Sequence, residues 1–363
     1  MKIAVITPLF ALSGVPLAQV RLARALAARG NAVDLVIGHI LPGYEFEAPV
    51  GIRTAVLNCP NVRSMLWPII RYLRTEKPDV VFTAEDHLNT LVLIAAWLAR
   101  SKAKITGSSR VTPFDTYSNT IFSKRWVLKQ LARYVMKRAD ALTCVSQDMV
   151  VQYRKVFASP PHVCVYNIVD DTYSRNRMLE PVEHPWLRDN RMPVLVAAGR
   201  LAPWKGFVDL IEAVAILKNR RQFRLMILGD GPLRNELQNL IQLRSLADTV
   251  ELLGYVENPL KYFARADVFV LSSLVEGMPN VLVEAMMSGC TPVSTDCPTG
   301  PRELLQGGKY GYLVPMRDPQ AMSAAIECAL DNPISRTLLD EAVAPFEENR
   351  VIDRHFELLG LQE

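Results

Sequence analysis

The run GRLAPWKGF, residues 199–207, brings two cations to a candidate anion-binding loop. It follows an expected strand and opens onto an expected helix, so free backbone N–H groups and the positive end of the helix dipole favour an anion there. Arg200 can form paired hydrogen bonds with a phosphate, and Lys205 adds a mobile point charge. We predict that Gly199, Arg200 and Lys205 bind a diphosphate and neutralise it as it departs. The alternative is a surface turn with two solvated cations.

The run EGMPNVLVEAMMSGC, residues 276–290, holds two carboxylates eight residues apart. Glycine and proline make its first part a turn, and a helix is expected to begin near Asn280. Glu276 would then lie in the turn, and Glu284 about one turn into the helix. Carboxylates accept hydrogen bonds from the neighbouring hydroxyls of sugars and ribose. On spacing alone, a helix-start acid and a solvated helix residue are an equal alternative.

A third loop, GDGPLRNEL from Gly229, also follows an expected strand and starts a helix. Its glycines could allow the close approach of a ligand or only a tight turn, and both interpretations stay open.

A basic segment, SKRWVLKQLARYVMKR at residues 123–138, predicts a helix with two distinct faces. The apolar face contains Val127, Leu131, Tyr134 and Val135. The other face carries four cations four residues apart, with no acid among them: Arg125, Lys129, Arg133 and Lys137. Because like charges at this spacing repel, we expect an anionic partner. Trp126 and Met136 lie within the basic face, as on a helix resting among lipid headgroups. The alternative is a solvated basic face with Trp126 packed on a neighbouring loop.

Alternating strands and helices position these runs. Short β-branched segments separated by amphipathic stretches are typical of parallel sheets built from strand–helix–strand units. The expected strands are residues 2–7, 32–37, 80–83, 104–107, 141–145, 163–166, 194–198, 224–228, 250–253, 268–271 and 291–294. The first helix should bury Ala18, Leu22, Ala25 and Leu26 and stop at Gly30.

A chain of 363 residues is long enough for two domains. We predict an N-terminal acceptor-binding domain at residues 1–170 and a linker without a clear period at 171–192. A C-terminal donor-binding domain would follow at 193–345, with a helical tail at 346–363 that packs back on the first domain. The predicted fold class is α/β, with two Rossmann-like parallel-sheet domains facing across a cleft and ligands at the carboxyl ends of the strands.

Charge is unevenly divided between the two halves. Residues 1–170 hold 21 Lys and Arg against 11 Asp and Glu, whereas residues 171–363 hold 20 against 26. The basic half implies an anionic surface or ligand. Nucleic acid is disfavoured because no aromatic-interleaved platform or binding module is present.

Six scattered cysteines form no Cys-x-x-Cys pair, which argues against zinc or a disulfide framework and favours a reducing compartment. The N-terminus leads directly into a strand, so no signal peptide is expected. The longest apolar stretch, residues 88–99, is too short to span a bilayer.

Five motifs together resemble the C-terminal half of the retaining family-four glycosyltransferases, which have the GT-B fold. They are GRLAPWKG, GDGPLRNEL, LLGYV, EGMPNVLVEAMMSG and TPVSTDCPTGPREL, in the family's order and spacing, and they cover nearly all of residues 190–330. The N-terminal half resembles the family more loosely, through its opening strand and loop and through VYNIVD around Asn167.

The resemblance implies that Glu276, Arg200 and Lys205 act in catalysis. The two cations would bind the donor's diphosphate, Glu276 the donor sugar and Glu284 the ribose. The turn after Glu276 would offer backbone N–H groups to the donor. The backbone around Tyr255 and Val256, at the end of the LLGYV motif, would face the nucleotide base. The donor-binding residues implied there are Gly277, Met278, Pro279, Asn280 and Val281, with Tyr255 and Val256 at the base.

The same resemblance implies retention of anomeric configuration, no metal and no other cofactor. The donor would be a nucleotide-linked, most simply UDP-linked, hexose or N-acetylhexosamine. The acceptor would be a lipid-linked or polysaccharide glycan, and we expect a cytoplasmic enzyme that is peripheral at the inner face of the cell membrane. A soluble small-molecule acceptor is the alternative.

The sequence departs from the family in two loops. Many members have a Gly-Gly pair before the first helix, where this chain reads Leu12-Ser13-Gly14 with one glycine; Gly14 is the donor-binding candidate there. Several members also have a histidine after the strand at 104–107, where this chain has Ser108, Ser109 and Arg110. We assign His87, Ser109 and Arg110 to the acceptor side, with His87 not catalytic.

Other function classes fit less well. A dinucleotide-dependent oxidoreductase would need a G-x-G-x-x-G after the first strand, and the chain has none there. A nucleotide-sugar epimerase or phosphorylase shares the two-domain plan and stays open. A non-catalytic sugar-binding protein would be expected to lack Arg200, Lys205 or Glu276, and all three are present.

Overall fold

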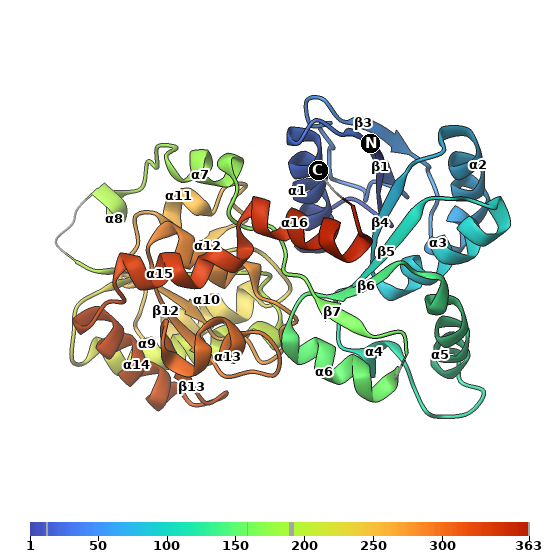
Figure 1. Ribbon diagram of the computed structural model, residues 1–363. Coiled ribbons are helices and arrows are strands. Elements are labelled where there is room, and N and C mark those ends of the chain that lie inside the picture. Colours follow the sequence, from blue (N-terminus) through green and yellow to red (C-terminus); the bar gives the residue numbers. More distant parts are fainter. Residues whose placement is uncertain (12–13, 158, 189–191, 362–363) are drawn as a thin grey trace. The chain divides into compact units, whose positions relative to one another are not determined.

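The computed structural model describes residues 1–11, 14–157, 159–188 and 192–361, and it divides into two compact units (Figure 1). The first unit contains Met1–Ile168 and Phe346–Glu363, and the second contains Val169–Pro345. Leu12 and Ser13, part of the predicted donor loop, lie outside the described residues. Each unit is an α/β domain built on its own parallel sheet.

The sheet of the first unit has seven parallel strands in the order β3-β2-β1-β4-β5-β6-β7. The strands are β1 (Lys2–Thr7), β2 (Ala32–Ile37), β3 (Arg53–Val56), β4 (Val80–Ala84), β5 (Lys104–Ser109), β6 (Ala141–Cys144) and β7 (His162–Cys164). The sequence predicted all of these except β3. This strand lies at the sheet edge, where no residue of RTAV is fully buried, so it has no apolar run to reveal it.

Helices α1 (Gly14–Ala28), α2 (Leu66–Glu76), α3 (Asp86–Ala99), α4 (Pro113–Thr116), α5 (Lys124–Val135) and α6 (Gln147–Val156) complete the first unit. As predicted, α1 buries Ala18, Leu22, Ala25 and Leu26. The C-terminal helix α16 (Glu348–Leu359) lies beside α1 and adds Val351, Ile352 and Phe356 to the same core (Figure 1).

The sheet of the second unit has six parallel strands in the order β10-β9-β8-β11-β12-β13. They are β8 (Val194–Ala198), β9 (Arg224–Leu228), β10 (Val250–Gly254), β11 (Val268–Leu271), β12 (Thr291–Thr295) and β13 (Tyr312–Val314). The three-residue edge strand β13 was not predicted, because so short a run carries no periodic signal.

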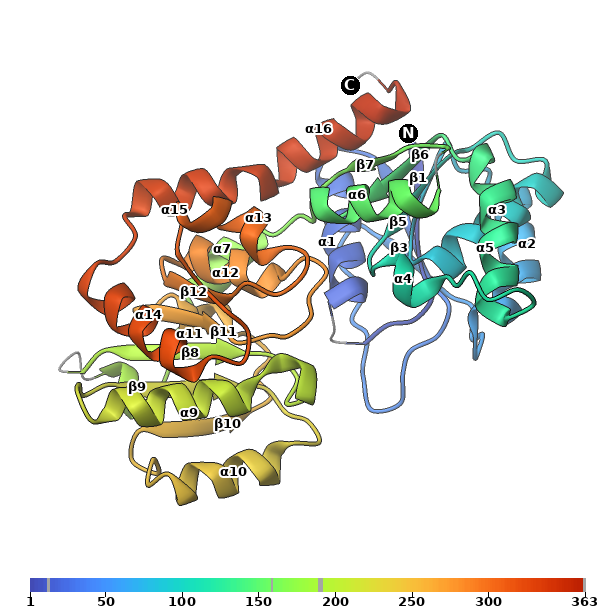
Figure 2. The same ribbon diagram turned by 90° about the horizontal axis from the view of Figure 1, so that it is seen from below.

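The helices of the second unit are α7 (Thr172–Met178), α8 (Pro185–Arg188), α9 (Phe207–Lys218), α10 (Arg234–Leu243), α11 (Leu260–Phe263), α12 (Asn280–Ser288), α13 (Pro301–Leu304), α14 (Pro319–Asp331) and α15 (Arg336–Val343). Figure 2 shows α9, which packs against α10 and α14. The segment predicted as a linker contains α7 and α8. A side-chain cap starts α7, since Asp171 accepts a hydrogen bond from the N–H of Ser174 at 2.6 Å.

Candidate functional site

The loops that follow β8, β9 and β11 touch one another through glycine backbones. A β-carbon at Gly229 would lie 2.0 Å from the carbonyl oxygen of Gly199, and one at Gly206 would lie 2.0 Å from that of Ser272. No side chain fits in either place. The glycines of the GDGPLRNEL loop are therefore explained by contact with the neighbouring loop, and these contacts fix the shape of the carboxyl edge of the sheet.

Lys205 and Glu276 meet at this edge, although they are 71 residues apart in the sequence. The lysine Nζ lies 2.5 Å from Glu276 Oε1, and the side chains are 18% and 11% exposed. The hydroxyl of Ser273 donates to the same carboxylate oxygen at 2.6 Å. The hydroxyl of Ser272 donates to the carbonyl of Lys205 at 2.8 Å, so the backbone that carries the lysine is also held. The structure thus unites two predicted residues in a fixed, largely desolvated pair.

The turn after Glu276 is packed against the PTGP segment. A β-carbon at Gly300 would lie 2.6 Å from Pro279 Cδ and 3.2 Å from the carbonyl oxygen of Gly277, and Gly300 has a φ of +93°. The hydroxyl of Thr299 donates to the Glu276 carbonyl. These contacts place Gly277, Met278 and Pro279 in one rigid turn.

Helix α12 begins at Asn280, as predicted, directly after this turn. Its N-cap residue, Pro279, makes no side-chain hydrogen bond to the first turn, so no N-cap side chain blocks the helix start where Val281 lies. Glu284 lies about one turn further on, half-buried. An anion or a hydroxyl-bearing ligand could therefore approach the backbone at this helix end.

Arg200 lies two positions beyond β8 and is exposed. Among the described residues, its guanidinium forms no ion pair, and no hydrogen bond joins it to Lys205 or Glu276. The structure therefore brings together two of the three predicted catalytic side chains and leaves the third on the same loop.

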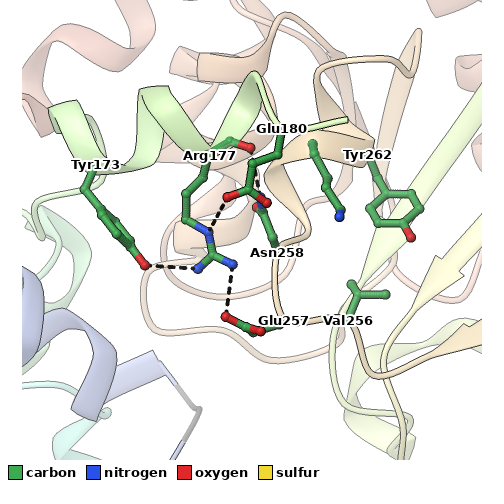
Figure 3. Close-up of a pocket in the computed structure, with 8 residues that line it drawn as sticks. Tyr173, Arg177, Glu180, Val256, Glu257, Asn258 and Tyr262 are labelled. Carbon is green, nitrogen blue, oxygen red and sulfur yellow. Dashed lines mark hydrogen bonds and ion pairs between the residues drawn. The ribbon is translucent and has the colours of Figure 1, made fainter. Parts of the chain in front are cut away.

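Tyr255 and Val256 follow β10, and Val256 lines a pocket of about 350 Å³ (Figure 3). Arg177 of α7 crosses the pocket wall, with nitrogens 3.6 Å from Glu180 and 3.4 Å from Glu257. The amide of Asn258 donates to Glu180 at 2.8 Å. The loop predicted to face a base is therefore braced by α7. Sequence reasoning missed this helix, although its Asp cap and its Arg and Glu three residues apart are helix signals.

The first unit places a second polar group at the carboxyl ends of β4 and β5. Asp86 is buried and accepts hydrogen bonds from Ser109 Oγ at 2.6 Å and from the Tyr153 hydroxyl at 2.7 Å. Burial raises the pKa of Asp86. Ser109, predicted on the acceptor side, is thus buried and engaged within the unit, whereas His87 is exposed.

Arg110 and Glu85 lie next to this group, both half-buried. One Nη of Arg110 donates to the Asn167 side chain, and burial lowers the pKa of Arg110 to about 10. Burial also raises the pKa of Glu85, against the opposing effect of Arg110. The sequence analysis missed Glu85, although an acid directly after a buried strand was a signal.

Two family descriptions match this chain and together span both units. Residues 13–167 match the Glycosyl transferase 4-like domain, and residues 192–332 match Glycosyl transferases group 1. A glycosyltransferase of Methanocaldococcus jannaschii is 32% identical over 295 residues, which covers 72% of this chain and 71% of the relative. The chain belongs to the family-four-like glycosyltransferases.

Two further proteins resemble this glycosyltransferase. An N-acetylgalactosaminyltransferase of Campylobacter jejuni, named for its action on N-acetylgalactosamine-N,N'-diacetylbacillosaminyl-diphospho-undecaprenol, is 30% identical over 256 residues, covering 70% of this chain and 67% of the relative. HepE from Anabaena, solved in complex with UDP and glucose, matches 99% of both chains with a TM-score of 0.74 at 19% identity. The predicted fold class, GT-B with two parallel-sheet α/β domains, is confirmed by such structural matches.

The basic helix of the glycosyltransferase, α5, does not pack as its periodicity suggested. The predicted apolar face lies largely in solvent, with Val127 52%, Leu131 43% and Tyr134 68% exposed. The helix instead buries Ala132 and Val135, and Met136 follows them into the core. Of the four residues of the predicted apolar face, Val135 is therefore buried, and small Ala132 rather than the other three faces the domain.

The four cations of the predicted basic face, the last of which follows α5, also divide into two pairs. Arg125 donates to the carbonyls of Phe114 and Tyr117, and Lys129 donates to the Asn119 side chain at 2.6 Å. These two cations brace the loop before the helix. Arg133 and Lys137 remain exposed beside the solvent-facing apolar residues.

Trp126 is half-buried and Met136 is buried, so neither rests on an outer basic face. The ring of Trp126 lies 5.8 Å from that of Phe122, just before the helix.

In the described ranges of this glycosyltransferase, His, Cys, Asp and Glu side chains form no group that could hold a metal ion. Within those same ranges, no helix is both long and apolar enough to cross a membrane. Gly14 opens α1 in an exposed position, and a β-carbon there would meet no atom within 4 Å.

Proposed function

We propose that this glycosyltransferase moves a hexose or N-acetylhexosamine, with retention, from a UDP-sugar to a lipid-linked glycan at the cytoplasmic membrane face, without a metal. The observation that carries the proposal is the Lys205–Glu276 pair, held at 2.5 Å at the carboxyl edge of the second sheet. The Campylobacter relative acts on a glycan linked to diphospho-undecaprenol, and HepE binds UDP and glucose; both support this choice of substrates.

The pair gives the donor a charged and a hydrogen-bonding contact at one point. Lys205, sharing its ammonium between Glu276 and the diphosphate, would offset the charge that develops as the sugar–phosphate bond breaks. Glu276 would accept hydrogen bonds from the donor sugar, and exposed Arg200 would close on the diphosphate from the same loop. The bond from the sugar's anomeric carbon to the acceptor oxygen forms as the nucleoside diphosphate leaves.

The donor residues in α12 and the β10 loop complete this proposal. Glu284 would bind the ribose hydroxyls, and the start of α12 would offer the backbone N–H groups of Gly277, Met278 and Val281, in a turn shaped by Pro279 and Asn280. The backbone of Tyr255 and Val256 would contact the base, and a donor-binding role for Gly14 stays a prediction from the family resemblance.

A screen of nucleotide sugars tests the donor. Binding of the right donor raises the melting temperature by mass action, and slow hydrolysis should follow. A transferase releases nucleoside diphosphate rapidly only when an acceptor, such as a polyprenyl-diphosphate-linked N-acetylhexosamine, is added. Conversion of the donor without any acceptor would support the epimerase alternative and contradict the proposal. Transfer to soluble sugars alone would contradict the proposal that the acceptor is lipid-linked.

The proposed membrane contact is the outer face of α5, defined as Val127, Leu131, Tyr134 and Arg133 together with Lys137 just after the helix. Exposed apolar side chains flanked by cations match an anionic lipid surface, where the apolar groups enter the acyl boundary and the cations meet headgroups. No acidic residue occurs between residues 116 and 139, so nothing on this segment offsets the positive charge. This contact would hold the enzyme at the membrane beside a lipid-linked acceptor.

A further inference from the structure

The loop after β10 is held at both of its ends. At its start, the N–H of Gly229 donates to the carbonyl of Gly254 at 2.7 Å, which ties the end of β10 to the residue that follows β9. At its other end, Asn258 is buried, and its side-chain oxygen accepts a hydrogen bond from the N–H of Leu260, where α11 begins, at 3.2 Å. Residues 255–257 span the gap between these two fixed points.

Helix α7 and the turn after it hold the second of these ends. The amide nitrogen of Asn258 donates to the backbone carbonyl of Arg177 and to the Glu180 carboxylate, both at 2.8 Å. The guanidinium of Arg177 lies 3.4 Å from the Glu257 carboxylate, and its Nε lies 3.6 Å from that of Glu180 (Figure 3). The same guanidinium lies over the ring of Tyr173, 5.6 Å from the ring centre. Arg177 therefore holds the loop with both its backbone and its side chain.

The surroundings of Arg177 suit it to holding the loop rather than to binding a ligand. Its side chain is 20% exposed and lies between the carboxylates of Glu180 and Glu257, which offset its charge. A phosphate would therefore meet no net positive charge there. The rigid, planar guanidinium has several donors and can connect separate acceptors at once. These features make Arg177 a connection between α7 and the loop.

We infer that Arg177 is a positioning residue for the donor's nucleobase, which it orients through the loop after β10 without touching it. The inference rests on the proposed function, in which the backbone of Tyr255 and Val256 contacts the base. A loop that is already fixed binds a base without the entropy cost of being ordered on binding. Loss of Arg177 would leave two like charges, on Glu180 and Glu257, that the arginine had connected. The loop should then be less well fixed, and affinity for the base should fall.

Isothermal titration calorimetry on the whole chain tests this inference with two probes: UDP, which carries a base, and inorganic pyrophosphate, which does not. Arg177→Ala should bind UDP about five- to ten-fold more weakly, as for a residue that acts on a site without touching its ligand. Its affinity for pyrophosphate should equal that of the wild type, because Arg200 and Lys205 are unchanged.

Two further variants complete the experiment. Arg177→Lys keeps a positive charge between the two glutamates, so its loss of UDP affinity should be smaller, again with pyrophosphate affinity unchanged. This variant also serves as the test if Arg177→Ala does not fold. The matched control is Arg221→Ala, which removes an arginine that pairs with Asp331 and precedes β9, at the opposite edge of the sheet. It should bind both probes like the wild type.

Three results would overturn the inference. The first is equal UDP affinity in the wild type and Arg177→Ala. The second is an equal loss of affinity for UDP and for pyrophosphate, because Arg177 would then support the unit as a whole rather than the base loop. The third is a wild type that binds neither probe. That result contradicts the proposed donor site as well, whereas the first two leave the donor site standing.

Discussion

Lys205 and Glu276 show what single residues contribute to the donor site. Removing one preorganised charge-stabilising group commonly costs about 100-fold or more in turnover, and Lys205→Ala and Glu276→Ala should each do so while leaving the fold intact. Initial rates of nucleoside diphosphate release with acceptor measure the loss. Lys218→Ala, which removes an exposed lysine of α9, is the matched control and should keep full activity. Near wild-type turnover in either site variant would contradict the assignment.

The residue types at this site could be predicted from the sequence, but their pairing could not. A cation after a strand and an acid in a glycine–proline turn each indicate a ligand-facing loop. The contact between Lys205 and Glu276 depends on β8 and β11 lying side by side in the sheet, which no local pattern reports.

At the scale of the loops, Gly206 connects the Lys205 turn to helix α9. Its φ is +65°, and a β-carbon would lie 2.0 Å from the carbonyl oxygen of Ser272. Gly206→Ala should therefore lower stability by more than the roughly 1 kcal/mol of backbone strain alone, and should also reduce turnover by displacing Lys205.

Gly43→Ala is the control for Gly206→Ala, because Gly43 also has a positive φ, +84°, but no atom within 4 Å of a β-carbon. Thermal melts and turnover of the two variants separate the effect of backbone strain alone, in Gly43→Ala, from strain combined with a steric clash, in Gly206→Ala. Equal losses of stability and turnover in the two variants would mean that the loop at Ser272 moves away from the new β-carbon without an energetic cost.

Helix α5 shows the limit of periodicity at the element scale. The spacing correctly predicted a helix with an apolar side and a basic side, but not which side the domain would cover. That choice depends on what α5 meets: Arg125, although exposed, donates to the loop carbonyls of Phe114 and Tyr117. The edge strands β3 and β13 were missed because three or four partly exposed residues carry no pattern.

The outer face of α5 gives a prediction of its own. Val127→Ser, Leu131→Ser and Tyr134→Ser combined should weaken binding to phosphatidylglycerol vesicles by about ten-fold or more, since the apolar area that enters the lipid is lost. Vesicle flotation measures it, and higher salt should weaken wild-type binding through the cations. Leu243→Ser, at an exposed leucine of α10, is the control. If the triple variant floats like the wild type, this face is not the membrane contact.

At the scale of the whole chain, residues from both ends form the first unit, and the second unit is formed by the segment between them. Strand alternation was enough to predict two parallel-sheet domains, and helix α16 then completes the first unit's core far from the sequence that begins it. Arg29, directly after α1, forms an ion pair with Asp353 of α16 at 2.5 Å. Periodicity predicts that such a tail is helical; the burial of its apolar face against α1 depends on which partner surface is available.

The dependence of the first unit on α16 can be measured through Phe356, a buried residue of that core. Phe356→Ala should destabilise the first unit by about 3–5 kcal/mol, because the lost transfer free energy adds to the cost of a cavity. Hydrogen exchange should then quicken in β1, β4 and α1 but not in β8 and β11, and UDP should still stabilise the second unit. Arg354→Ala, at an exposed ion pair on the same helix, should change little. Uniform acceleration across both sheets would mean that the two units unfold as one, and unchanged exchange would mean that the return of α16 contributes nothing to the first core.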